Sequence, residues 1–198
     1  MSLPEHLPST VPVPGAYLYP DSLGVGLLID YEMGGDALND GSAGLQLQAW
    51  ACWAEPSGDV VIKPLASAAD PVLLFNAAGI TELSFAFDRN MRVSVAYTVG
   101  GIVKLRWYDS AVPGYVTTDF PGIRNPRLSH DDKRDSFSSQ SDVIFAYLSG
   151  TELRWREQRD RYDTEYVWAA GILPSLRLKS IGMNGALRMQ AEFERIAS

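Results

Sequence analysis

The chain is poor in the residues that most often build catalytic and metal sites. Among 198 residues it has one cysteine, Cys52, and two histidines, His6 and His130. One cysteine cannot form an intramolecular disulfide, and neither histidine has a second histidine at metal-ligand spacing. We therefore expect no metal and no cofactor, and a structural place for Cys52 within a strand. Calcium is left open, since oxygen ligands are plentiful.

The sequence also lacks the motifs of common enzymes. It has no Gly-rich phosphate loop and no G-x-S-x-G turn. Asp131 and Asp132 are neighbours that would point to opposite faces of a strand, which makes them a poor catalytic pair. Asp163 and Glu165 would share the solvent face of an antiparallel sheet. We expect a protein that is not an enzyme and takes no small-molecule substrate.

Neither a basic surface nor a long apolar run is present. Lys and Arg number 17 against 24 Asp and Glu, a net charge of −7. This balance argues against nonspecific binding to nucleic acid or to an anionic membrane, which both need a basic face. No apolar run is long enough to span a bilayer, and the first residues do not read as a signal peptide. We expect neither nucleic acid nor membrane as a partner, and synthesis in the cytoplasm.

What the sequence does have is a two-residue period, most clearly over residues 143–168. There the chain reads VIFAYLSGTELRWREQRDRYDTEYVW, with aromatic and β-branched residues at alternate positions. This period is typical of strands with one buried face. We predict three antiparallel strands, the last including Tyr162, Thr164, Tyr166 and Trp168.

Residues 93–120 resemble this stretch. The shared residues are Ala96-Tyr97 with Ala146-Tyr147 and Leu105-Arg106-Trp107 with Leu153-Arg154-Trp155, with two additional residues at the Gly100-Gly101 turn. One more strand before each copy gives four-stranded repeats at about 80–120 and 125–168. Their length is within the range of a propeller-type blade. Two such repeats do not close a propeller, which usually takes four or more blades.

The remaining segments complete an all-β prediction of antiparallel meanders. Residues 1–20 hold five prolines and form an extended, proline-rich arm. Residues 21–198 form a single all-β domain of about ten to twelve strands, with no convincing amphipathic helix. Asn184-Gly185 is a strong hairpin signal and predicts a C-terminal hairpin over residues 174–194.

Two segments are candidate subunit interfaces. The arm is too apolar for a simple disordered tail, and its prolines disfavour a central strand. We therefore expect it to dock on an adjacent subunit or on a different protein instead of closing the core of its own domain. Arginines are enriched in interface cores, and several lie within the second repeat. The candidate contact residues are Leu3, Leu7, Val11, Val13, Tyr17, Tyr19, Arg156, Arg159 and Arg161.

The string DVIFAYLSGTELRWREQRDRYDTEY, preceded in order by GLLIDYEMGGDALNDGSAGLQLQAW, SFAFDRN and RLSHDDKR, resembles tail structural proteins of tailed bacteriophages. The similarity covers residues 24–194. It implies a non-enzymatic virion structural protein of the tail tip, baseplate or nozzle, made in the host cytoplasm and placed in the virion tail. Its implied partners are copies of itself in a ring and other tail or baseplate proteins. No functional residue is carried over.

Two other functions stay open. One is a receptor- or glycan-binding β module of a tail fibre or host-attachment apparatus, with Trp107 or Trp155 as a sugar-stacking residue. The other is a glycoside hydrolase related to sialidase-type propellers. The S-x-D-x-G turns of those propellers are missing from this sequence, which counts against the hydrolase.

Overall fold

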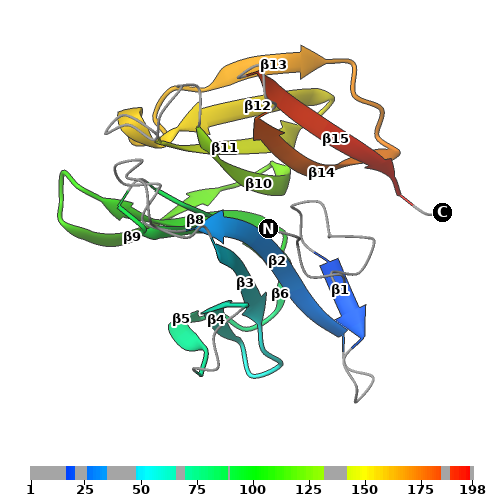
Figure 1. Cartoon of the computed structure of the whole chain (residues 1–198). Coiled ribbons are helices and arrows are strands. Elements are labelled where there is room, and N and C mark those ends of the chain that lie inside the picture. The colour runs from blue at the N-terminus through cyan, green and yellow to red at the C-terminus, as the bar shows by residue number, and fades with distance from the viewer. Residues whose placement is uncertain are drawn as a thin grey trace, which may run out of the picture.

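The computed structural model of the chain describes residues 17–20, 26–34, 48–65, 70–88, 90–131, 142–183 and 188–196. These residues form fifteen strands and one 3-10 turn, η1 (Gln158–Asp160). The strands make four antiparallel sheets, so the all-β prediction is confirmed (Figure 1). The strands outnumber the expected ten to twelve because several are only four or five residues long, too short to show a period in the sequence.

Each sheet is a meander in which sequence neighbours pair. The first sheet runs β1 (Tyr17–Pro20), β2 (Gly26–Gly34), β3 (Gln48–Ala54), β4 (Asp59–Pro64) and β5 (Val72–Asn76). The second runs β6 (Ile80–Phe87), β7 (Val93–Val99), β8 (Ile102–Asp109) and β9 (Gly114–Phe120). The third runs β10 (Arg124–Asp131), β11 (Asp142–Ser149), β12 (Glu152–Glu157) and β13 (Tyr166–Ala170). The fourth is the hairpin of β14 (Leu176–Met183) and β15 (Met189–Arg195).

The sheets are stacked face to face, from β1–β5 at the bottom of Figure 1 to β10–β13 at the top. Three apolar cores fill the spaces between successive sheets. The first core includes Cys52 and Phe85, the second Leu105 and Phe145, and the third Leu148 and Leu178. Cys52 is fully buried, as expected for a structural residue. Four layers and three cores give the chain a large buried apolar area, the main favourable term in folding.

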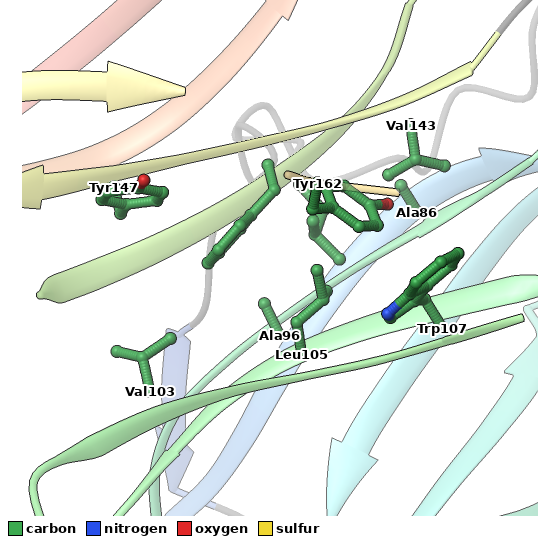
Figure 2. Close-up of a cluster of buried hydrophobic side chains, with 10 residues drawn as sticks. Ala86, Ala96, Val103, Leu105, Trp107, Val143, Tyr147 and Tyr162 are labelled. Atoms are coloured by element: carbon green, nitrogen blue, oxygen red, sulfur yellow. The ribbon is translucent and has the colours of Figure 1, made fainter. Parts of the chain in front are cut away.

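Strands of the two middle sheets are buried on both faces. Along β11, Val143, Phe145 and Tyr147 face the second sheet, whereas Ile144, Ala146 and Leu148 face the fourth. Strands with two covered faces read as continuous apolar runs, and this explains the run of six apolar residues in the sequence. Figure 2 shows the core between the second and third sheets, where Leu105 and Trp107 lie opposite Tyr147 and Tyr162.

Both predicted repeats are four-stranded antiparallel meanders, but their residue correspondence differs from the expected one. The β7–β8 and β11–β12 hairpins each have a turn of two residues. Val99 lies opposite Ile102 in the first, and Ser149 lies opposite Glu152 in the second. Equal turns leave no room for two additional residues in the first copy. Positions in the β7–β8 hairpin therefore correspond to those in the β11–β12 hairpin at a spacing of fifty residues, and Tyr97 matches Tyr147 as expected.

This spacing shows that the predicted match of Trp107 with Trp155 is wrong. Ala96 pairs with Leu105, and Ala146 pairs with Trp155, so Leu105 occupies the position of Trp155. Trp107 is 4% exposed in the second core, whereas Trp155 is only partly buried beside the third. The shared letters Leu-Arg-Trp had shifted the alignment by two residues. Assignment of the two meanders as propeller blades stays a prediction.

The predicted third strand of the second repeat begins later than its residue pattern indicated. β13 starts at Tyr166, and Tyr162 belongs to the loop before it. Arg161 and Tyr162 both have positive φ angles, 62° and 61°, which a strand does not allow. This turn carries the Tyr162 ring into the core between the second and third sheets, where it packs edge-on against Trp107 with ring centres 5.2 Å apart.

The two ends of the chain also refine the expected boundaries. Residues 17–20 of the predicted arm form β1, which pairs with β2 through contacts such as Tyr17 opposite Ile29 and Tyr19 opposite Leu27. The domain's own sheet therefore includes these four residues, as an edge strand, which proline at position 20 tolerates. The C-terminal hairpin is confirmed, and its turn at 184–187 lies outside the described residues.

Candidate interaction site

The candidate arginines lie in β12 and in the loop after it, and the structure places each beside a carboxylate of the same chain. Arg156 contacts Glu165 at 3.1 Å, Arg159 contacts Glu157 at 2.7 Å, and Arg161 contacts Asp109 at 2.6 Å. The arginine segment, residues 156–161, is therefore held by ion pairs within the chain. Its alternating positive and negative charges favour such pairs. The role of these arginines as a subunit interface stays a prediction.

Arg156 is the least exposed of these three arginines and fastens the loop before β13. Its Nε donates to the Tyr147 hydroxyl at 2.7 Å, and one terminal nitrogen donates to the carbonyl of Tyr162 at 2.7 Å and of Asp163 at 3.0 Å. The guanidinium also lies over the ring of Phe120 of β9, 5.5 Å from its centre. The planar guanidinium group has five N–H donors in a fixed arrangement, so it can make these contacts together. The ammonium group of a lysine has only three donors and could not replace it.

Glu165 collects hydrogen bonds from several donors in this network. The Tyr147 hydroxyl and an Arg154 terminal nitrogen both donate to its carboxylate. Burial acts to raise the pKa of Glu165, but the hydrogen bonds from Tyr147 and Arg154 outweigh burial and lower it. Burial raises the pKa of Tyr147, and its hydrogen bond to Glu165 raises it further. Glu165 therefore stays ionised and Tyr147 stays protonated, as a stable structural tie requires.

Arg159 joins two carboxylates at the start of β11 and the end of β12. Its Nε lies 2.7 Å from Glu157 and 3.7 Å from Asp142. Burial raises the pKa of Asp142 to about 6, although a backbone hydrogen bond from Val143 and the charge of Arg159 oppose this shift. The side chain of Asp142 is 10% exposed and that of Arg159 is 43% exposed. The arginine therefore covers a carboxyl group that is about half ionised near pH 6.

Arg161 lies in the loop between β12 and β13, and its side chain contacts the second sheet. Its partner Asp109 ends β8, and this carboxylate is almost fully covered while the arginine is half exposed. Burial acts to raise the pKa of Asp109, but hydrogen bonds from Arg161 and the backbone of Ala111 lower it. Gln158 also approaches the Tyr108 carbonyl at 3.5 Å. The arginine segment therefore helps to fix the second and third sheets to each other.

The candidate residues of the arm are divided between described and undescribed parts of the chain. Tyr17 and Tyr19 lie in β1, at one edge of the first sheet. Leu3, Leu7, Val11 and Val13 lie outside the described residues. Tyr17 and Tyr19 belong to the first sheet and the candidate arginines to β12 and the loop after it, so these described residues do not form one site.

The two tryptophans proposed for sugar stacking have different surroundings. Trp107 is buried between two sheets and cannot present its ring to a sugar. Trp155 stacks on Tyr166 with ring centres 4.7 Å apart, and Tyr166 is 41% exposed. Of the two, only Trp155 belongs to an aromatic pair that solvent can reach.

Sequence reasoning missed a hollow beside β5. Its volume is about 170 Å³, and it is lined by Leu73, Leu74, Phe75, Val93, Val95, Arg106 and Tyr115. The hollow forms where β5 ends the first sheet while the second continues to β8 and β9. A sequence signal existed in the uncharged run Val-Leu-Leu-Phe at 72–75, but nothing in the sequence places that run at a sheet edge.

Within the described ranges, no three His, Cys, Asp or Glu side chains are grouped so that they could hold a metal ion. In the same part of the chain, no helix has the length and apolar character needed to cross a bilayer.

The fold and the ion-paired segment define an all-β protein of stacked antiparallel meanders. Comparison of the chain with protein families, curated proteins and solved structures finds no match.

Proposed function

We propose that the chain is a non-enzymatic structural subunit of a bacteriophage tail, at the tail tip, baseplate or nozzle. It acts through protein–protein contacts, with copies of itself in a ring and with other tail proteins, and its location is the virion. The ordered sequence blocks that resemble such proteins are the reason for naming the tail.

The observation that best supports a structural role is the continuous stacking of four sheets through three apolar cores. Ion pairs of the arginine segment reinforce this stack, since Arg161 ties the third sheet to Asp109 of the second. A subunit of a symmetric assembly needs a stiff body with open edges, because contacts repeated around a ring must keep one geometry. Within the described residues, β1 and β5 are the outer strands of the first sheet, and each pairs on one side only, which offers such edges.

Electron microscopy of the purified full chain tests the assembly part of this proposal. We expect closed rings of uniform diameter at micromolar concentration, together with a single high-mass species in sedimentation. A chain that remains monomeric across this concentration range would contradict a self-assembling ring subunit.

The second candidate, a glycan-binding module, is favoured by the Trp155–Tyr166 stack alone. Aromatic pairs that reach solvent can bind the apolar faces of sugars. A glycan array probed with the full chain, compared with Trp155→Ala, tests this role. Binding that the substitution abolishes would support the module, and a blank array would argue against it.

A further inference from the structure

The first sheet has an unprotected edge at β5. Val72 and Leu73 are each 59% exposed, and within the described residues no strand pairs with the outer side of β5. Its inner side pairs only with β4, for example Val60 opposite Phe75. Natural proteins commonly protect such edges with charges or prolines inside the strand, and β5 has neither. The edge therefore offers backbone donors and acceptors next to apolar side chains.

The hollow beside β5 places aromatic side chains next to this open edge. Phe75 and Tyr115 form two of its walls, and the Arg106 guanidinium lies 5.3 Å and 5.0 Å from the centres of these rings. Tyr115 is 42% exposed. Aromatic walls beside an open strand edge are the usual features of a surface that binds an extended peptide.

The chain itself contains a segment with the matching chemistry, Val-Pro-Val-Pro at residues 11–14. In an extended strand, alternate residues direct their backbone groups to opposite edges. Val11 and Val13 can therefore pair with β5 through one edge. Pro12 and Pro14 would then lie on the outer edge, which faces solvent. The backbone N–H that proline lacks is not needed there, and its absence prevents a further strand from pairing.

We propose that residues 11–14 of one copy add to β5 of a second copy as a further strand, with side chains of the arm covering the hollow. This inference rests on the proposed ring function and names the contact that would form the ring. The arm precedes β1, at the opposite edge of the same sheet from β5. A contact between opposite edges of successive copies is heterologous, the type that closes rings.

The distances permit this contact. Residues 11–14 end three residue steps before β1, and an extended chain spans about 10 Å over those three steps. The width of the five-stranded sheet is about 19 Å at the usual strand spacing. The span of about 10 Å is shorter than the width of the sheet, so residues 11–14 do not reach β5 of their own chain while β1 stays paired with β2. An arm leaving β1 outward meets the β5 edge of the next copy without crossing a sheet.

Crosslinking between two singly substituted full-length chains tests the contact. Val13→Cys is mixed with Leu73→Cys, and a short bismaleimide is added to the assembled protein. The native Cys52 is fully buried and stays in place. The matched control replaces Leu73→Cys with Val167→Cys, because Val167 is 58% exposed on β13, an edge strand of the third sheet. Melting temperatures of all variants verify that they fold.

The expected result is a covalent dimer of the two chains, at least tenfold more abundant than in the control mixture. Crosslinks found only within single chains of the double variant Val13→Cys/Leu73→Cys would overturn the proposal in favour of self-docking. Dimers formed by Leu73→Cys alone would overturn it in favour of pairing between two β5 edges, and no adduct at all would overturn it outright. Rings that form without the arm crosslink would disprove this contact while leaving the proposed function standing.

Discussion

A terminal nitrogen of Arg161 donates a hydrogen bond to the Asp109 carboxylate at 2.6 Å, and this ion pair joins the third sheet to the second. The two residues are fifty-two positions apart in the sequence. Arg161 can reach Asp109 because it follows a 3-10 turn in the left-handed conformation, with φ of 62°. The pair therefore depends on an unusual backbone turn as well as on opposite charges.

We expect Arg161→Ala to lower the free energy of unfolding at pH 7, and Arg161→Lys to lower it less. The pKa of Asp109 is depressed, so its favourable contribution is present above the ordinary carboxyl pKa and disappears as pH falls through the folded value. Urea unfolding at pH 7 and pH 3 checks this expectation. A cost that is equal at both pH values would contradict the role of the ion pair.

Trp107→Ala should cost about 3–5 kcal/mol of unfolding free energy, because it leaves a cavity between the second and third sheets. Trp107 is almost fully buried and contacts the Tyr162 ring. Trp155→Ala serves as the matched control, and we expect it to cost less because Trp155 is only partly buried. Equal costs, measured by urea unfolding, would show that the two tryptophans have equivalent surroundings after all.

Tyr162→Phe should be neutral or stabilise the protein by about 1 kcal/mol. The Tyr162 hydroxyl is buried close to the Ser94 hydroxyl, and within the described residues neither group makes a hydrogen bond of normal geometry. Removal of an unpartnered buried hydroxyl relieves a desolvation cost while the ring packing is kept. A clear loss of stability in thermal unfolding would show that the hydroxyl has a partner.

Asp142→Asn should stabilise the protein at pH 8 but not at pH 4. Burial raises the pKa of Asp142 to about 6 in the folded protein, above the ordinary value of 3.8. Folding therefore carries a cost that is absent below the ordinary pKa, grows as pH rises and is complete above pH 6. A difference of about 2 pH units corresponds to at most about 3 kcal/mol. Unfolding titrations from pH 4 to 8 check this, and a gain that does not depend on pH would contradict it.

The all-β class and most of the strands could be predicted from the sequence alone. The two-residue period and the Gly150-Thr151 turn were sufficient for β11 and β12, and Asn184-Gly185 was sufficient for the final hairpin. These features are local, so a single sequence can show them.

Other features depend on long-range contacts or on backbone angles. The left-handed turn at Arg161 and Tyr162 has no glycine to signal it, so the strand pattern ran through it in the sequence. The ion pair of Arg161 with Asp109 and the hollow beside β5 join residues from different sheets. Residue patterns alone do not show which sheets stack, and these contacts were therefore beyond sequence reasoning.

Deletion of residues 2–16 should leave the melting temperature almost unchanged and abolish incorporation into particles. The deletion removes the part of the arm before β1 and keeps the strand that pairs with β2. Deletion of residues 2–20 is the comparison, and it should lower the melting temperature because it removes β1. If the shorter deletion unfolds the isolated protein, the arm belongs to the core of its own domain.

Immunogold labelling of purified tailed-phage particles that carry the chain tests the proposed tail role most directly. An antibody against the folded chain, or against a short tag at its C-terminus, is viewed by negative-stain electron microscopy. We expect gold at one fixed position on the tail, at the tip, baseplate or nozzle, in most particles. Particles that remain unlabelled on the tail, with the chain found only in the soluble fraction of the infected cell, would contradict the proposal.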